Sequence, residues 1–277
     1  MSLKCLIYLV LISVGLLLLE VCLSEDEMQP REVNYKKFIG ERHYVVPFKT
    51  RISQPFQEGQ TIHGVGMIKP DAKRIDINFH KGASRNADLP LHLSIRFDEG
   101  KMVYNTYMGG IWSSNEQRLK NLFKPNTEMD IRIRIINKKY QIFANRVAAG
   151  TFEQRVPLDG VDHVSINGDL VSLRLFHYGG RVFPIPYTAV AEVVPGKRLD
   201  ISLLPTDKHL KCVNGHFTNC IDADITVINE RYSFQIFFNG VRFTTFAHRG
   251  SPDDIRTLEI DGECEIFSVT VNNAGGE

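Results

Sequence analysis

The sequence contains an internal repeat, and this repeat constrains the fold more than any other feature. The segment 140–152 recurs as 232–246, and most matched positions are 94 residues apart. The beginning of the first copy, from Val46 to Pro70, likewise recurs from Ile185 to Pro205. The second half of the chain is therefore a copy of the first, so the two halves should share an architecture.

The second copy is shorter in its middle. Pro70 and Asn137 are 67 positions apart, whereas the matching Pro205 and Asn229 are only 24 apart. We therefore expect the copy to lack several central strands. Because a sandwich that loses strands exposes strand edges and apolar surface, we expect the copy to pack on the first domain or on another chain.

Short segments in which apolar and polar residues alternate fill both halves of the chain. Clear cases are Arg74–Phe79, Ile131–Ile136 and Tyr140–Phe143, and Gly, Pro, Asn and Asp separate such segments. Almost no stretch has apolar residues at the 3.6-residue spacing that an amphipathic helix requires. The pattern predicts an all-β fold built as an antiparallel sandwich.

The N-terminus has the layout of a secretory signal peptide. Lys4 precedes an apolar run from Leu6 to Leu19, and the small Ser24 is followed by an acidic segment. The run is shorter than the roughly 20 apolar residues of a usual membrane span. We therefore expect residues 1–24 to be the signal peptide of a secreted protein and residues 25–43 to be a polar linker. An uncleaved N-terminal membrane anchor is the alternative.

The charge balance argues against nucleic acid as a partner. The chain has 33 basic and 32 acidic residues, so it creates no global field that would attract a polyanion. A ligand is expected to be neutral or only locally charged.

The cysteines outside the leader are Cys212, Cys220 and Cys264, which are too few for a disulfide-dense scaffold. Cys212 and Cys220 could close a small disulfide loop in an oxidising compartment. Together with His209 and His216 they also have zinc-capable chemistry, but at no familiar finger spacing. We favour the disulfide, or two buried thiols, over a metal site, and we expect no cofactor.

Polar side chains gather on two consecutive predicted strands of the first copy. In the segment 90–97, apolar residues alternate with His92, Ser94 and Arg96. One face of the strand should therefore pack in the core, and the other should carry functional side chains or face solvent. A turn at 98–101 returns the chain along this strand, which can place Asn105 beside His92. Farther along the chain come the only tryptophan and two charged residues: Trp112, Glu116 and Arg118.

The order and spacing of these residues resemble the galectin family. The family pattern H-x-N-x-R, V-x-N and W-x-x-E-x-R stands here as His92-x-Ser94-x-Arg96, Val103-x-Asn105 and Trp112-x-x-x-Glu116-x-Arg118. The resemblance implies a galectin-like antiparallel β-sandwich, or jelly roll, at residues 44–180 and a shortened galectin-like domain at residues 184–273. It also implies a non-enzymatic lectin that binds β-galactosides, with galactose-containing glycans as its partners.

The resemblance also implies a role for each residue. Trp112 would stack on the apolar C–H patch of galactose. Arg118 would pair with Glu116 through a charge-assisted hydrogen bond and reach the neighbouring sugar. The galactose hydroxyls would be bound by the remaining polar residues of the pattern: His92, Arg96, Asn105 and Glu116, with Ser94 in the place of the family's Asn.

Two departures from the family pattern bear on this site. Ser94 removes a carbonyl acceptor, and one extra residue separates Trp112 from Glu116. Losing one neutral hydrogen bond costs about 0.5 to 1.5 kcal/mol. These departures motivate a rival hypothesis, in which the protein keeps the fold, has lost the sugar and acts as a structural or adhesion module. The second copy lacks every motif residue, so one site per chain would need a homodimer to cross-link glycans.

A glycoside hydrolase is a further alternative that the sequence does not favour. Glu259-Ile-Asp-Gly-Glu263 matches an E-x-D-x-E arrangement, which places an acid and a nucleophile on one strand face. The matching segment 165–169 of the first copy has no carboxylate pair, and Gly262 would interrupt the strand. We therefore expect no enzymatic activity.

Overall fold

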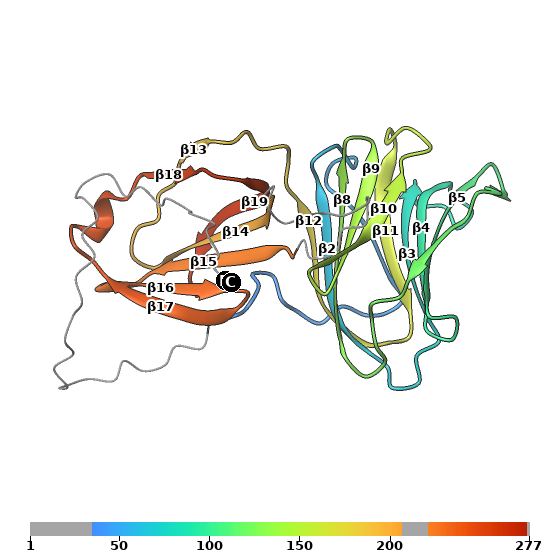
Figure 1. Ribbon diagram of the computed structural model, residues 1–277, viewed down its shortest axis with the longest axis horizontal. Coiled ribbons are helices and arrows are strands. Elements are labelled where there is room, and N and C mark those ends of the chain that lie inside the picture. The colour runs from blue at the N-terminus through green and yellow to red at the C-terminus, as the bar shows by residue number, and fades with distance from the viewer. Residues whose placement is uncertain (1–34, 207–220, 276–277) are drawn as a thin grey trace.

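The chain forms two all-β domains that follow one another along the long axis of the molecule (Figure 1). The structure is a computed structural model that describes residues 35–206 and 221–275. The predicted signal peptide, most of the predicted linker, and Cys212 and Cys220 with their neighbouring histidines lie outside the described residues. Within the described part, no helix has the length and apolar character needed to cross a membrane. The predicted all-β fold class is confirmed.

Two antiparallel sheets build the first domain. The larger has seven strands in the order β1-β11-β3-β4-β5-β6, with β7 also paired to β5, and the smaller has the order β10-β9-β8-β2-β12. The strands are β1 (Phe48–Arg51), β2 (Thr61–Ile68), β3 (Arg74–Lys81), β4 (Leu89–Arg96), β5 (Lys101–Met108), β6 (Ile111–Trp112), β7 (Gln117–Lys120), β8 (Glu128–Ile136), β9 (Lys139–Ala144), β10 (Val147–Glu153), β11 (Val161–Gly168) and β12 (Leu170–Gly179).

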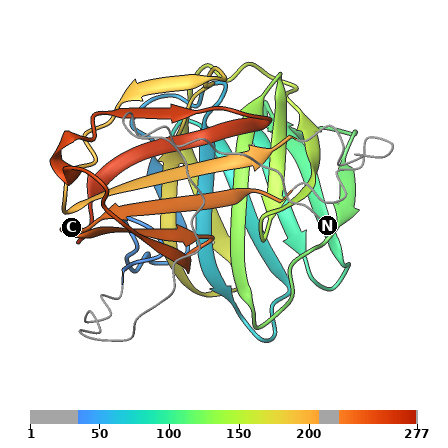
Figure 2. The same ribbon diagram turned by 60° about the vertical axis from the view of Figure 1, so that its left-hand side comes forward.

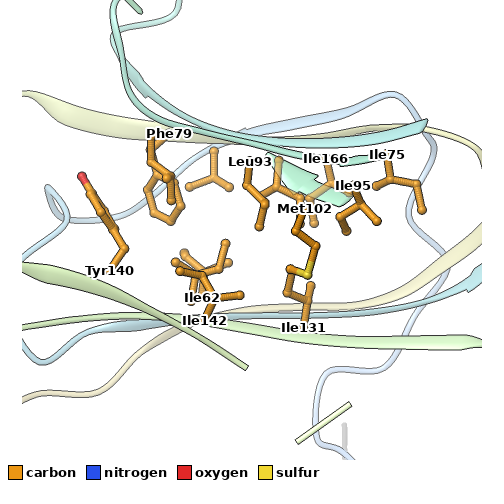
Figure 3. Close-up of a cluster of buried hydrophobic side chains, with 14 of the residues drawn as sticks. Ile62, Ile75, Phe79, Leu93, Ile95, Met102, Ile131, Tyr140, Ile142 and Ile166 are labelled. Carbon is orange, nitrogen blue, oxygen red and sulfur yellow. The ribbon is translucent and has the colours of Figure 1, made fainter. Parts of the chain in front are cut away.

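Apolar side chains from both sheets fill the space between them (Figure 3). Ile75 and Leu93 of the seven-stranded sheet face Ile62 and Ile131 of the five-stranded sheet, and each of them is at most 2% exposed. Because successive side chains of a strand point to opposite faces, this core fixes which residues of the same strands point outward. The outer face of the seven-stranded sheet is polar, whereas that of the five-stranded sheet carries both charged and apolar residues.

The second domain repeats the smaller sheet and only part of the larger one. Its five-stranded sheet has the order β17-β16-β15-β14-β19, which matches β10-β9-β8-β2-β12, and β13 pairs with β18 as β1 pairs with β11. Between β14 and β15, the described residues contain no counterpart of β3 to β7. The elements are β13 (Tyr187–Val190), β14 (Lys197–Pro205), β15 (Ala223–Asn229), β16 (Ser233–Phe238), β17 (Val241–Ala247), the short 3-10 helix η2 (Pro252–Asp254), β18 (Thr257–Ile260) and β19 (Cys264–Asn273).

The repeat extends to individual hydrogen bonds in the turns. Asn145 Oδ1 accepts from the backbone N–H of Asp130 at 3.0 Å, and Asn239 Oδ1 accepts from that of Asp224 at 2.9 Å. Both asparagines have a positive φ, of 49° and 54°, a region that asparagine tolerates better than most residues. The two copies therefore use the same turn at positions 94 residues apart.

The reduced sheet of the second domain leaves apolar side chains uncovered. In the first domain, Phe152 of β10 is 1% exposed and stacks on Tyr104 of β5, with ring centroids 5.9 Å apart. The matching Phe246 of β17 is 39% exposed, and its neighbour Phe243 is 76% exposed. No counterpart of β5 covers them among the described residues, which explains the difference in exposure.

The second domain packs on the outer face of the first domain's five-stranded sheet (Figures 1 and 2). Arg132 and Arg134 of β8 point out of this sheet, yet they are only 2% and 1% exposed. Arg132 lies 2.7 Å from Asp222 and donates to Asp224, also at 2.7 Å, and Arg134 pairs with Glu265. The second copy thus packs on the first domain.

A buried charge network carries the polar part of this interface. Besides Arg132, Arg146 donates to Asp224 at 2.6 Å, and His63 lies 2.8 Å from Asp130. Burial lowers the pKa of Arg132, but the carboxylates of Asp224, Asp222 and Asp130 raise it more, so Arg132 stays charged. Burial raises the pKa of Asp222 to about 7, against the opposing effect of the arginines. An unpaired charge would be costly here.

Apolar contacts complete the interface. The rings of Phe143 on β9 and Phe267 on β19 are 5.4 Å apart at their centroids, and Leu204 joins the same buried cluster. The guanidinium of Arg134 lies over the Phe267 ring at 4.6 Å. The second domain therefore covers both charged and apolar surface of the first domain.

A fragment of residues 184–277 is expected not to fold alone. Separation would expose Phe267 and remove the arginines that neutralise Asp222 and Asp224, both of which belong to the second domain. Circular dichroism during heating should detect no cooperative transition in this fragment, whereas the whole chain should melt cooperatively. A soluble fragment that melts cooperatively as a monomer would contradict this dependence.

Candidate functional site

The polar outer face of the seven-stranded sheet brings the predicted site residues of the first domain together. His92, Ser94 and Arg96 lie on β4, and Asn105 of β5 is the direct cross-strand partner of His92. The side chains of facing residues on neighbouring strands are close enough to interact. The sheet thus places Asn105 beside the His92 row, as the sequence predicts.

A tight turn between β5 and β6 positions Trp112. The turn residues Gly109 and Gly110 have φ values of 57° and 84°, which glycine adopts without steric cost. β6 consequently pairs with β5 so that Trp112 is opposite Tyr107. The indole packs against the rings of His92 and Tyr107, at centroid distances of 4.8 and 5.0 Å, and stays 48% exposed. An aromatic face is thereby fixed beside the polar row.

His92 has a defined tautomer. Its Nδ1 lies 2.6 Å from Oδ1 of Asn78, an atom that can only accept, so Nδ1 carries the proton and donates. Nε2 then carries the lone pair, with Arg74 Nη2 as a long donor at 3.5 Å, and burial is the main reason that the pKa of His92 is lowered. His92 is therefore a neutral side chain that offers a hydrogen-bond acceptor.

Asn105 is 5% exposed and held by its own loop. Its Nδ2 donates to the Ser113 carbonyl at 3.1 Å, and its Oδ1 accepts from the backbone N–H of Thr106 at 2.7 Å. A side-chain amide has two N–H donors, so one more is available to a ligand. The side chain is oriented before any ligand arrives.

Two arginines and two glutamates form an ion network beside Trp112. Arg118 Nε donates to Glu116 at 2.6 Å, which is the predicted pair, and its Nη1 donates to Glu99 at 2.6 Å. Arg96 Nη1 donates to Glu99 at 2.9 Å, and its Nη2 lies 4.0 Å from Glu116. The hydrogen bond from Arg96 is the main reason that the pKa of Glu99 is lowered. The network holds the donors and acceptors of this corner in fixed positions.

The extra residue between Trp112 and Glu116 does not remove Glu116 from the site. Residues 113–116 form a loop between β6 and β7, and Arg155 secures it by donating to Ser113 Oγ at 3.2 Å and to the Asn115 carbonyl. Glu116 still reaches both arginines. The loop absorbs the insertion.

Ser94 differs from the other predicted residues because it has no exposed surface. Its hydroxyl accepts from Arg96 Nε at 3.4 Å, so it lies beneath the arginine. Glu99 and Asn78 were missed at the sequence level. Glu99 sits three residues after Arg96 in the turn before β5, where only its spacing from the arginine could have identified it.

The E-x-D-x-E segment does not form a paired-carboxylate site. β18 ends at Ile260, so Glu259 lies on the strand while Asp261 belongs to the turn that follows. Gly262 has a φ of 117°, which ends regular strand geometry there. The three carboxylates therefore do not share one strand face.

A cavity of about 330 Å³ lies between the two domains, away from this polar face. Asp200 and Asp224 line it, but Arg198 contacts Asp200 at 2.8 Å, and Arg132 and Arg146 contact Asp224. The acidic groups of this cavity are thus already neutralised.

The chain is similar to known lectins along most of its length. The galactoside-binding lectin family matches residues 47–176 and 193–271. A 32 kDa beta-galactoside-binding lectin of Caenorhabditis elegans is 31% identical over 274 residues, which cover 83% of this chain and 98% of that protein. A lectin of the same name from Haemonchus contortus is 32% identical over 270 residues, which cover 82% and 95%. Among solved structures, Caenorhabditis elegans galectin LEC-6 is 27% identical, covers 51% of this chain and 94% of that chain, and has a TM-score of 0.45. The chain therefore belongs to the galactoside-binding lectin family, whose members bind carbohydrate and are not enzymes.

Proposed function

We propose that the first domain binds β-galactosides on the outer face of its seven-stranded sheet and that the protein is a secreted lectin. The observation that carries this proposal is the half-exposed Trp112 ring fixed against His92, beside the ion network of Arg96, Glu116 and Arg118. A pyranose needs a flat apolar surface next to convergent donors and acceptors. The relatives named as beta-galactoside-binding lectins support the same ligand class.

The tautomer of His92 suggests how a galactose hydroxyl would be bound. The hydroxyl would donate its proton to His92 Nε2 and accept a hydrogen bond from the Arg96 guanidinium. Both hydrogen-bonding functions of one hydroxyl are then satisfied. The hydroxyl in question is the axial one of galactose. Glucose has an equatorial hydroxyl at the same carbon, which would point away from His92 and Arg96, so this arrangement favours galactose over glucose.

Secretion and valency are parts of the same proposal. The sequence of residues 1–24 supports export, and a mature N-terminus after Ser24 would be its direct sign in terminal sequencing. The described part of the second domain has no counterpart of β4 to β7, the elements that carry the site. We therefore propose one sugar site per chain, with a homodimer needed for cross-linking.

Replacing Trp112 with alanine is expected to weaken lactose binding at least about tenfold, because the stacking surface is removed while the hydrogen-bonding groups remain. Calorimetric titration of the variant and the parent protein measures the difference. In the parent, lactose should also quench the fluorescence of this only tryptophan. Tyr232→Ala is a matched control, because this exposed aromatic lies in the second domain. Unchanged lactose affinity in W112A would contradict the proposed site.

The alternative function is a structural or adhesion protein that has lost the sugar. The complete burial of Ser94 favours it, because the acceptor that the family pattern places there is not presented. A well-folded parent protein that binds neither lactose nor N-acetyllactosamine would support this alternative.

A further inference from the structure

Ser94 presents no hydrogen-bond acceptor to a ligand in the proposed sugar site. The residue has no exposed surface, and its hydroxyl is engaged by Arg96 Nε. A side chain without exposed surface cannot contact a ligand. An acceptor between His92 and Arg96 must therefore come from another strand if the site is to have one.

Asp76 stands where such an acceptor is needed. In the β3–β4 ladder, Asp76 is the direct partner of Ser94, and its neighbours Arg74 and Asn78 are opposite Arg96 and His92. These alternate residues of β3 share the outer face of the sheet. The Asp76 side chain is 26% exposed, so its carboxylate is open to a ligand.

Arg74 holds this carboxylate in place. Its Nε donates to both Asp76 oxygens, at 2.8 and 3.0 Å. A carboxylate has about four lone-pair sites, so acceptor capacity remains after these contacts. Arg74 Nη2 also lies 3.5 Å from Nε2 of His92, the ring nitrogen that carries the lone pair. The pair thus reaches the nitrogen that is expected to face the sugar.

We propose that Asp76 supplies the hydrogen-bond acceptor that Ser94 does not present, and that Arg74 is its positioning residue. The proposal rests on the proposed function of the first domain. A galactoside hydroxyl donates to the Asp76 carboxylate, while the ion pair with Arg74 keeps the carboxylate oriented. The site then keeps an acceptor in this position, but takes it from β3 instead of β4.

Lactose titrations of four full-length proteins test whether Asp76 supplies the acceptor in place of residue 94. The proteins are the parent, D76A, S94N and the double variant D76A/S94N. D76A is expected to bind lactose about tenfold more weakly or worse, because a hydrogen bond to a charged group is lost. S94N restores an amide at the family position, so it should recover most of the affinity in the D76A background. The two substitutions are therefore expected to be strongly non-additive.

Two further variants make the result decisive. D71A removes an exposed aspartate from the turn before β3 and should bind like the parent. D76N keeps one acceptor oxygen and should bind more tightly than D76A, and both should melt close to the parent. Equal affinities of D76A and the parent would overturn the inference while leaving the lectin function intact. A loss in D76A that S94N does not recover would also overturn it, and a parent that binds no galactoside would overturn both.

Discussion

Replacing Arg132 with alanine is expected to destabilise the protein by about 3 to 5 kcal/mol, since it leaves the buried Asp222 with only Arg146 at 3.9 Å and removes one of the two arginines that contact Asp224. Arg132 is 2% exposed and contacts Asp222 and Asp224 at 2.7 Å each, and both of these belong to the second domain. For a chain of this size, the loss should lower the melting temperature by roughly 10 °C. Differential scanning calorimetry of R132A and the parent measures it.

Arg51 offers a matched control for this experiment. Its side chain is 77% exposed and lies 3.9 Å from Asp162, so the pair is screened by water. Exposed pairs of this kind contribute at most about 1 kcal/mol, and R51A should melt close to the parent. If R132A also melts within a degree or two of the parent, the interface does not depend on the charge network.

The second large effect expected is a loss of stability as pH rises from about 4 to about 7. The pKa of Asp222 is raised to about 7 by burial, so the folded protein holds a proton that the unfolded chain releases near pH 4. The free energy of unfolding from this group is fully present below pH 4 and falls as pH rises toward 7, by at most about 1.4 kcal/mol per pH unit. The charged groups that face Asp222 are Arg132, Arg146, Asp224 and Asp130.

The buried histidines act in the opposite direction. Burial lowers the pKa values of His63 and His177, so the unfolded chain binds protons at these residues more readily than the folded protein does. Their contribution to the free energy of unfolding therefore falls as pH decreases below 6.5. The variant D222N removes the aspartate titration and leaves the histidines unchanged. Urea unfolding at pH 5, 6.5 and 8 measures the free energy of unfolding of both proteins. The value for the parent should decrease relative to that for D222N as pH rises. A constant difference across the three pH values would contradict the assignment.

The fold could be predicted from the sequence because its signals are local. Strict alternation in β4 and β8 identifies strands with one apolar face, and the 94-residue spacing identifies the repeat. The same alternation places His92 and Arg96 on one face and indicates the return of Asn105 beside them. These inferences need only the period of a strand and the length of a turn.

The covering of an outer face could not be predicted in this way. Arg132 and Arg134 alternate with isoleucines, which is the pattern of a solvated strand face, yet the second domain buries both. Alternation shows that a strand has two faces but not what lies on the second one. Pairing across domains depends on contacts between residues that are 78 to 131 positions apart, and no local rule of charge or spacing identifies them.

The candidate site could be predicted only in part for a related reason. Sequence motifs identify the residues of β4 to β7, which are close along the chain. Asp76 and Asn78 reach the site from β3 through strand register, and Ser94 is withdrawn from the surface by the packing of Arg96 above it. Exposure and cross-strand neighbours are properties of the assembled sheet.

The back-to-back arrangement of the domains gives the molecule a polarity. The second domain occupies the outer face of one sheet of the first domain, so the sheet with Trp112 faces away from it at the opposite end of the long axis (Figure 1). An antibody or a solid support that binds the second domain would leave the face with Trp112 exposed to solvent. Attachment through the shortened second domain would therefore leave the candidate site of the first domain accessible.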